Sequence, residues 1–278
     1  PGTLFVVATP IGNLSDLTER AKETLSRVAH AACEDTRHSR ILFDRLGAHP
    51  RLWSLPAFDE KGRLGPLIEL LTGGEDLALV TDAGTPAISD PGGALVAAAV
   101  QAGVPVVPIP GPSAVAAAIS ASGLAADRFC FVGFLPRHGT GRARLLEQLR
   151  PLSMAVVLYE APNRLKETLV DLERVWGPRR ALVARELTKV HEELLRGTLG
   201  ELAGRLPEEV RGEIVLVVEG AAEAEEVVLT EEAIDAELRR LLGDKDRSVK
   251  DVSAQLAEQL GLPKKDLYKR ALQLLGKQ

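Results

Sequence analysis

Four turns with polar side chains follow predicted strands in the chain's first half, and three of them are rich in glycine and proline. They cover residues 9–13, 34–40, 82–92 and 110–114. In open α/β sheets, ligands bind outside the carboxyl ends of the strands; glycine allows close backbone approach there and proline fixes the turn. A tight connection explains any single turn equally well. Four such turns at one edge favour a ligand site that uses main-chain groups.

The turn at residues 34–40 is densely polar, with two acids, two arginines, a histidine and two hydroxyl side chains. Such a segment is hard to bury, so one interpretation is the solvated start of a helix. The other is the mouth of a site for a polar or anionic partner, because Arg37 and Arg40 can bind phosphate through paired hydrogen bonds.

Common cofactor and catalytic signatures are incomplete in this sequence. No Gly-x-Gly-x-x-Gly fingerprint follows the first predicted strand, and no Walker loop occurs. Residues 191–195 begin like a zinc-protease motif without its second histidine, and residues 111–115 resemble a nucleophile elbow without its closing glycine. Cys33 and Cys130 lack the spacing of a zinc site or a disulfide framework. We therefore expect no metal centre.

The composition is typical of a folded protein in a reducing cytoplasm. The 278 residues are 45% hydrophobic and 26% charged, and no apolar run approaches the roughly 20 residues that cross a bilayer. Aromatic residues make up only 4%, and the net charge is −5. These values disfavour base-stacking modules and generally basic nucleic-acid-binding proteins. Contact with nucleic acid must therefore come from a local basic patch.

Strands and helices alternate in the first 123 residues and would position these turns. We predict strands at 4–9, 77–81 and 106–109, with helices at 18–29, 37–46, 63–71 and 93–101. Asp90 and Pro91 are expected to supply the N-cap and first-turn residue of the last helix. The alternation predicts parallel strands joined by crossover helices.

A second α/β block and a helical extension follow. Strands are predicted at 129–133, 154–159, 181–185, 193–198 and 214–219, and helices at 142–149, 164–175 and 199–206. Two strands succeed each other without a helix, so we expect a mixed sheet. An acidic linker at 221–226 precedes helices at 230–242, 248–260 and 263–274, and the last pair is spaced like a helix-turn-helix. The predicted domains are 1–123, 124–222 and 223–278.

The helical extension carries the clearest basic excess. Residues 244–278 hold eight Lys or Arg side chains against five acids. This asymmetry is compatible with a nucleic-acid contact, and equally with a solvated helical tail.

Taken together, the motifs resemble the tetrapyrrole methylase superfamily, and within it the ribosomal branch that methylates ribose 2′-oxygens of small-subunit rRNA. The similarity spans roughly residues 3–220. It rests on residues 9–14, 34–39, 82–92, 110–115, 159–164, 184–189 and 212–216. Tetrapyrrole-modifying relatives have Gly-Gly-Asp-Pro in the third turn. This chain has Ala83-Gly84-Thr85-Pro86 instead, which favours the ribosomal branch.

The resemblance implies two α/β domains with S-adenosylmethionine in the cleft between them, leaving as S-adenosylhomocysteine. It also implies a homodimer that methylates a cytidine in the decoding centre of 16S rRNA, either as free RNA or in the assembled 30S subunit. The family's cofactor contacts fall on Pro10, Ala83, Gly84, Thr85, Ile88, Ser113, Ala114, Tyr159, Glu160, Ala184, Gly212 and Glu213.

Methyl transfer to a ribose hydroxyl requires alignment and removal of a proton, and a general base contributes roughly 10²–10⁴-fold. Candidate bases are Asp82, Asp35 and Glu186, while Lys189 is a candidate to lower the pKa of the hydroxyl or hold a phosphate. Asp82 ranks first because it directly follows a strand and adjoins a cofactor turn, although an Asx-turn would explain it too. We expect RNA to dock on the C-terminal helices and on Arg37, His38, Arg40, Arg137 and Arg142.

Two other functions compete with RNA methylation. One is methylation of a small tetrapyrrole-like acid. The other is a non-enzymatic factor that binds the ribosome or RNA.

Overall fold

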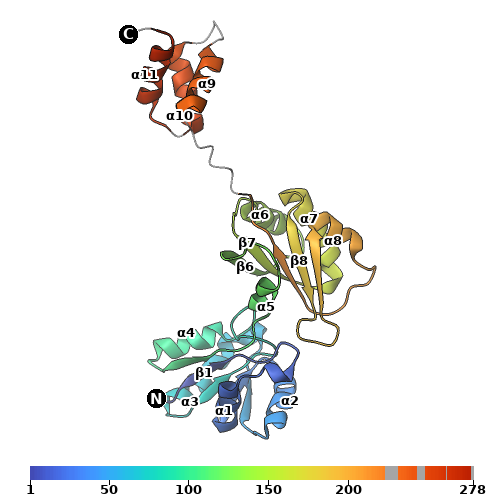
Figure 1. Cartoon of the computed structure of the whole chain (residues 1–278). Helices are drawn as coiled ribbons and strands as arrows, with labels where there is room; N and C mark the ends of the chain where they lie inside the picture. The colour runs from blue at the N-terminus through green and yellow to red at the C-terminus, as the bar shows by residue number, and fades with distance from the viewer. Residues whose placement is uncertain (223–230, 243–247, 261, 277–278) are drawn as a thin grey trace. The chain divides into compact units, whose positions relative to one another are not determined.

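The computed structural model describes residues 1–222, 231–242, 248–260 and 262–276. The chain divides into two compact units, Pro1–Ala221 and Ala222–Gln278 (Figure 1). Most of the predicted acidic linker, from residue 223 on, lies outside the described residues, as do the basic Lys245, Arg247 and Lys277. The predicted domain limits remain predictions.

The first sheet has five strands, all parallel, as the alternation of strands and helices predicts. In the order β3-β2-β4-β1-β5 they are Arg51–Ser54, His30–Cys33, Leu77–Leu79, Leu4–Val7 and Val106–Ile109. β4 is buried along its whole length, as expected for a strand covered on both faces.

Helices cover both faces of this sheet. α1 (Glu19–Arg27) and α2 (Thr36–Leu46) bury Leu25 and Phe43 against one face. α3 (Leu64–Thr72) and α4 (Gly93–Gln101) bury Leu67 and Leu95 against the other. Because crossover helices follow each strand, the loops that leave the carboxyl ends of β1, β2, β4 and β5 gather at one edge.

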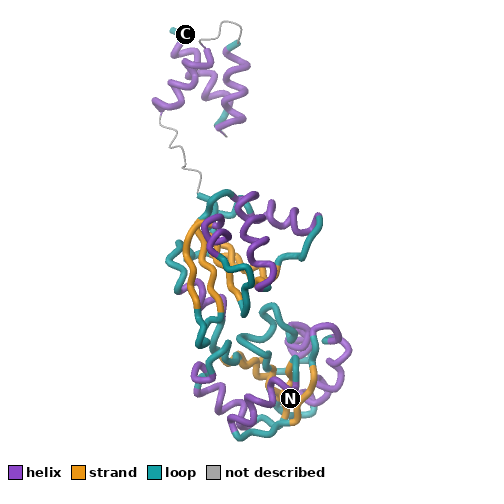
Figure 2. The backbone as a smooth tube through the Cα atoms, turned by 90° about the vertical axis from the view of Figure 1, so that its right-hand side faces the viewer, coloured by secondary structure: helices purple, strands orange, loops and turns teal. Residues whose placement is uncertain are grey.

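The second sheet is mixed, as predicted. In the order β6-β7-β10-β8-β9 its strands are Phe129–Phe134, Ala155–Glu160, Ile214–Val218, Arg180–Arg185 and Glu193–Thr198. Only β6 and β7 pair in parallel, and β10 lies antiparallel between β7 and β8. Figure 2 shows the strands of the first unit gathered into two separate groups.

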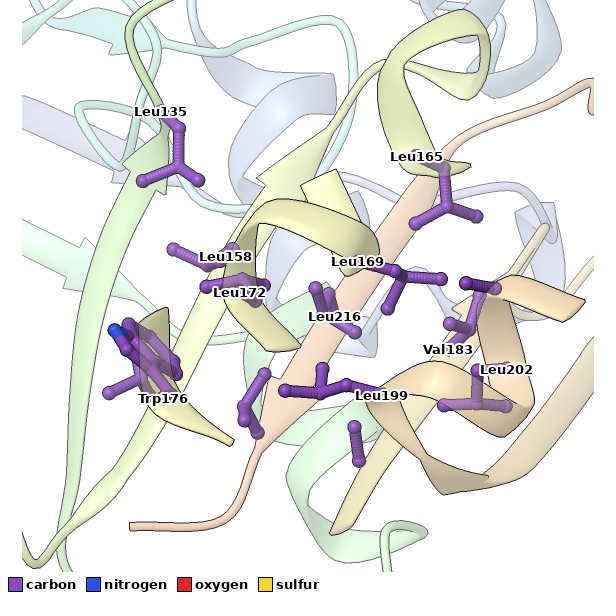
Figure 3. Packing of buried hydrophobic residues seen from close by; sticks show 14 of the residues in the cluster. Leu135, Leu158, Leu165, Leu169, Leu172, Trp176, Val183, Leu199, Leu202 and Leu216 are labelled. Atoms are coloured by element: carbon purple, nitrogen blue, oxygen red, sulfur yellow. The ribbon is translucent and has the colours of Figure 1, made fainter. Parts of the chain in front are cut away.

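One face of the second sheet is covered by α6 (Thr140–Leu149), α7 (Leu165–Trp176) and α8 (Leu199–Arg205). Leu165, Leu169 and Leu172 of α7 point toward Leu158 and Leu216 of the sheet (Figure 3). These leucines recur every three or four residues, so they form one apolar stripe of an amphipathic helix.

The opposite face of the second sheet is covered by α5 (Ala114–Ser120), which directly follows the first sheet. Val115 and Ala118 of α5 pack with Ile11 against Val157 and Val215. The last helix of the first α/β region thus contributes to the core of the second, which ties the two sheets into one unit.

Four predicted details need correction. The strand β3 and the helix α5 were absent from the expected elements, and the strand β2, which the turn at residues 34–40 was expected to follow, had no predicted bounds. Asp90 and Pro91 do not cap α4. Its N-cap is Gly92, and Glu60 Oε1 accepts hydrogen bonds from the amides of Gly92, Ala94 and Leu95 at 3.0, 2.7 and 3.2 Å. A carboxylate 32 residues upstream of Gly92 supplies the cap, which no local pattern reveals.

The second unit contains α9 (Glu231–Leu242), α10 (Val249–Leu260) and α11 (Lys264–Leu274). Their core includes Leu238, Val252, Leu256 and Leu267. Arg270 of α11 forms ion pairs with Asp235 and Glu231 of α9. These helices confirm the predicted fold class of two α/β sheets followed by a helical extension.

Candidate functional site

A cavity of about 430 Å³, called the main cavity here, lies where the loops of the two sheets meet. Its volume is within the roughly 300–1,000 Å³ usual for small-molecule sites. The wall contains eleven residues that the sequence predicts as site residues: Asp82, Ala83, Gly84, Thr85, Ile88, Ser113, Ala114, Tyr159, Glu160, Gly212 and Glu213.

Backbone hydrogen bonds hold two of the predicted turns together. Thr9 N–H donates to Gly84 O at 2.9 Å, and Gly84 N–H donates to Thr9 O at 3.1 Å, forming an isolated bridge. The Thr9 hydroxyl also donates to Thr81 O at 3.1 Å. Thr85 Oγ1 donates to Pro112 O at 3.4 Å, which links the third turn to the fourth. The turns therefore form a preassembled rim.

Left-handed backbone at residues other than glycine is concentrated beside the main cavity. Among the described residues, only Ala87, Ser89, Glu186 and Thr188 combine a side chain with positive φ, between 51° and 67°. They lie in two loops that supply Ser89 and Leu187 to the cavity wall. Each such residue costs about 1–3 kcal/mol, and such strain is commonest at functional sites.

The main cavity has an acidic wall that includes Asp82, Asp90 and Glu213. Burial raises the pKa of Asp90 above its usual 3.8, and the nearby charge of Asp82 adds to the effect. Burial, followed by the charges of Asp82 and Asp90, also raises the pKa of Glu34. The pKa of Tyr159 rises through burial and the same kind of repulsion. This environment favours a ligand that carries positive charge.

Lys189 connects two acids beside the cavity. Its Nζ lies 2.8 Å from Glu186 Oε1 and 2.9 Å from Glu213 Oε2. The hydrogen bond from Lys189 lowers the pKa of Glu186. Partial burial opposes the charge of Lys189, but its hydrogen bonds to both carboxylates raise its pKa overall. The three side chains form a charged network at the cavity's rim.

Two glycines allow this network to approach the turns. A Cβ on Gly12 would lie 2.5 Å from Lys189 Cγ. A Cβ on Gly212, whose φ is +93°, would lie 2.5 Å from Glu186 Cγ. Both positions thus require glycine: Gly12 leaves room for the aliphatic part of Lys189, and Gly212 leaves room for the carboxylate side chain of Glu186.

A second cavity of about 270 Å³, called the side cavity here, adjoins the main one. The two share Ile11, Asp82, Ala83 and Glu213. The predicted cofactor residue Pro10 lines the side cavity, and so do His38 and Lys189. Asp82 therefore lies on the wall common to both spaces.

Several predicted residues do not reach the main cavity. Ala184 is fully buried in the core behind α5 and does not line the main cavity, and the expected cofactor contact there stays a prediction. Asp35 lines neither cavity; its hydrogen bond with Arg37 lowers its pKa to about 2. Glu186 lines neither cavity, and its Oε1 accepts hydrogen bonds from Lys189 Nζ and from the backbone amide of Glu213, which do line the walls. Glu160 does line the main cavity, but its carboxylate is buried, and its Oε2 accepts a hydrogen bond from the Thr168 hydroxyl at 2.6 Å.

The predicted RNA-docking residues fall into two groups. Arg37, His38, Arg40 and Arg137 are exposed. Arg142 is only 5% exposed, and its guanidinium donates to Asp171 Oδ2, Pro136 O and Thr168 Oγ1 at 3.0–3.2 Å. The side chain of Arg142 is therefore engaged in the interior, and RNA contact by this residue stays a prediction.

The sequence reasoning missed nine wall residues. Most adjoin a recognised motif, and proximity to it is the signal that would have found them. Phe134 had no such signal, and Asp90 was assigned to helix capping instead. The nine are Ile11, Ser89, Asp90, Phe134, Ala161, Pro162, Leu187, Ile214 and Val215.

The described side chains include no group of three or more His, Cys, Asp or Glu arranged to hold a metal ion. Within the same ranges, no helix has the length and apolar character to cross a membrane.

Comparison with known families divides the chain into two matched regions. The model for Tetrapyrrole (Corrin/Porphyrin) Methylases matches residues 3–203, and that for the RsmI C-terminal HTH domain matches residues 228–275. A Synechocystis protein named Ribosomal RNA small subunit methyltransferase I is 45% identical over 275 residues, covering 98% of each chain. A Pseudomonas aeruginosa protein of the same name is 45% identical over 282 residues, covering 99% of each.

Solved structures support the fold. Uroporphyrin III C-methyl transferase from Thermus thermophilus matches 78% of this chain and 97% of its own, with a TM-score of 0.59 and 19% identity. A second structure of an enzyme with that activity and source, bound to S-adenosylhomocysteine, matches equal shares with a TM-score of 0.58 and 19% identity. Diphthine synthase matches 78% of this chain and 90% of its own, with a TM-score of 0.62 and 16% identity.

Proposed function

Because the chain belongs to the tetrapyrrole methylase family and, over its whole length, to the ribosomal RNA small subunit methyltransferases I, we propose that it methylates small-subunit rRNA with S-adenosylmethionine as donor. The proposed acceptor is the ribose 2′-oxygen of the cytidine at position 1402. This acceptor lies in the decoding centre of 16S rRNA.

The observation that carries the proposal is the acidic main cavity at the meeting point of the two sheets. Its rim of joined turns offers main-chain groups, and Asp82, Asp90 and Glu213 provide negative charge. A sulfonium is a cation, so this wall suits the charged donor better than the neutral product. The residues proposed to hold the donor are Ala83, Gly84, Thr85, Ile88, Ser113, Ala114, Tyr159, Gly212, Glu213 and the backbone of Glu160.

When bound, S-adenosylmethionine supplies an electrophilic methyl group on sulfur. The chain's own task is to align the acceptor and remove its proton. Asp82 Oδ1 is buried and has no hydrogen-bond partner among the described residues. We assign it as the base: the 2′-oxygen gains the methyl group and passes its proton to Asp82. Lys189 restrains Glu186 and Glu213 at the rim and is a positioning residue in this scheme.

RNA docking is proposed for the exposed Arg37, His38, Arg40 and Arg137 and for the C-terminal helices. α2 carries the first three residues, and His38 also lines the side cavity. A docking surface on α2 would therefore lead directly to Asp82. Phosphate contacts predict that binding weakens steeply as salt rises.

The test incubates the protein with labelled S-adenosylmethionine and 30S subunits, then maps the modified nucleotide by mass spectrometry. We expect one methylated ribose, at the proposed cytidine. Binding to 30S subunits without methyl incorporation would support a non-enzymatic factor instead. Incorporation into a small tetrapyrrole-like acid but not into RNA would support the small-molecule alternative.

A matched variant tests the base. Asp82→Asn should lower the single-turnover rate by roughly 10²–10⁴-fold, while calorimetry shows donor binding within a fewfold of the parent. A near-normal rate in this variant would remove Asp82 from the role.

A further inference from the structure

Polar side chains line the side cavity: Ser39 and Thr81 belong to its wall only, and Asp82 belongs to the walls of both cavities. Asp82 Oδ1 is buried and lacks a hydrogen-bond partner within the described part of the chain. Ser39 and Thr81 are each 3% exposed, with the Ser39 hydroxyl close to the Cys33 thiol and the Thr81 hydroxyl close to the Asp90 carboxyl. A buried polar atom without a partner costs about 1–3 kcal/mol, so Asp82 Oδ1 calls for a ligand that supplies one.

The rest of the wall indicates the kind of ligand. Leu14, Ile41 and Leu42 give the side cavity an apolar surface. A wall with apolar side chains and a few convergent polar groups is typical of sites for a small ring system with hydrogen-bonding edges. A nucleoside has this character: the base has apolar faces and polar edges, and the ribose supplies hydroxyls.

The size and form of the space decide how RNA presents that nucleoside. In an A-form duplex the 2′-hydroxyls lie along a wide, shallow groove, which a protein reads across an open surface. The side cavity is instead a half-open recess of about 270 Å³, and the Asp82 Oδ1 atom in its wall is buried. Enzymes whose target atom must enter such a pocket act on single strands or turn the nucleotide out of its stack.

We propose that the side cavity receives one nucleoside turned out of the RNA, with its 2′-hydroxyl at Asp82. This inference rests on the proposed function and adds the form in which the acceptor is bound. Asp82 is on the wall shared with the main cavity, so a nucleoside in the side cavity has its hydroxyl between base and donor. The Ser39 and Thr81 hydroxyls contact its polar edges, and Leu14 and Leu42 contact the base.

The main test fills the side cavity without touching the main one. Leu14 lines only the side cavity and is 44% exposed, so Leu14→Trp should fold. Val170→Trp on α7 is the control, since Val170 is 50% exposed and lines neither cavity. Leu14→Trp should lower the single-turnover methylation rate of 30S subunits about 100-fold through misplacement of the acceptor. Donor binding by calorimetry should match the parent in both variants.

Ser39→Ala is the second variant, because it removes a hydroxyl from the wall of the side cavity. Its thermal midpoint should stay close to that of the parent, since the neighbouring Cys33 thiol is only a weak hydrogen-bond partner, while the transfer rate falls about tenfold, the equivalent of one lost hydrogen bond. An unchanged rate in both Leu14→Trp and Ser39→Ala, or equal losses in Leu14→Trp and Val170→Trp, would overturn the inference. A parent protein that binds no S-adenosylmethionine would instead refute the proposed function.

Discussion

At the scale of single residues, Asp90 shows how burial adjusts charge at the main cavity. Its carboxyl sits beside Asp82, and burial together with that neighbour raises its pKa above 3.8. It is therefore ionised only above this raised value, and acid removes its charge sooner than that of an ordinary aspartate.

This shift predicts a pH dependence of donor binding. As the pH falls through the raised pKa, Asp90 takes up a proton and S-adenosylmethionine affinity should drop. Asp90→Asn should lose about 1 kcal/mol of affinity at pH 7, roughly fivefold, and show a flatter pH profile. S-adenosylhomocysteine, which has no sulfonium charge, is the control ligand in calorimetry and should be affected less. Equal losses for both ligands would contradict the assignment.

Arg142 and Arg137 are both predicted to contact RNA, but Arg142 is buried and Arg137 is exposed. Arg142→Met leaves Asp171 and Thr168 without their buried partner and should lower the free energy of unfolding by about 3–5 kcal/mol. Arg137→Met should leave stability within about 0.5 kcal/mol and weaken RNA binding with a shallower salt dependence. Chemical denaturation and filter binding separate the two effects. A stable Arg142→Met protein with weakened RNA binding would support the docking role.

At the scale of elements, α4 depends on a distant side chain. Glu60 accepts from three amides at its first turn. Glu60→Ala should therefore lower the free energy of unfolding by about 1 kcal/mol, as loss of a helix cap does. Glu75→Ala, at an exposed position, is the matched control and should change it by less than about 0.5 kcal/mol. Denaturant titration measures both, and equal values would argue against the cap.

Most elements could be predicted from periodicity and turn residues, but three could not. β2 reads His-Ala-Ala-Cys, which has no β-branched residue. β3 is an edge strand with exposed ends. α5, with four alanines in seven residues, gave no amphipathic signal because its partner is a sheet far along the chain. Tertiary packing stabilises all three elements, and the local sequence preferences do not indicate it.

At the scale of the molecule, the turn motifs identified most of the main cavity but not its shape. The recognisable residues lie at strand ends, which parallel topology brings to one edge. Phe134, Leu187 and the shared wall at Asp82 depend on how two sheets meet. The burial of Ala184 and Arg142 could not be predicted, because a sequence position does not reveal which way a side chain faces.

The division of the chain predicts separable activities. A protein ending at Ala221 retains every residue of both cavities. It should bind S-adenosylmethionine as the full chain does and bind 30S subunits more weakly, which calorimetry and sedimentation will measure. Loss of donor binding in this protein would show that the helical unit supports the cavity.

The place of β10 has a consequence for biosynthesis. This strand is the last of its sheet to be made, yet it lies between β7 and β8. A nascent chain that ends at α8 has the first sheet complete and the second split into β6–β7 and β8–β9. Folding during synthesis proceeds from the N-terminus, so the gap closes only when the ribosome has released residues 212–218. The binding site for the methyl donor is therefore incomplete in every nascent chain from which β10 has not yet emerged.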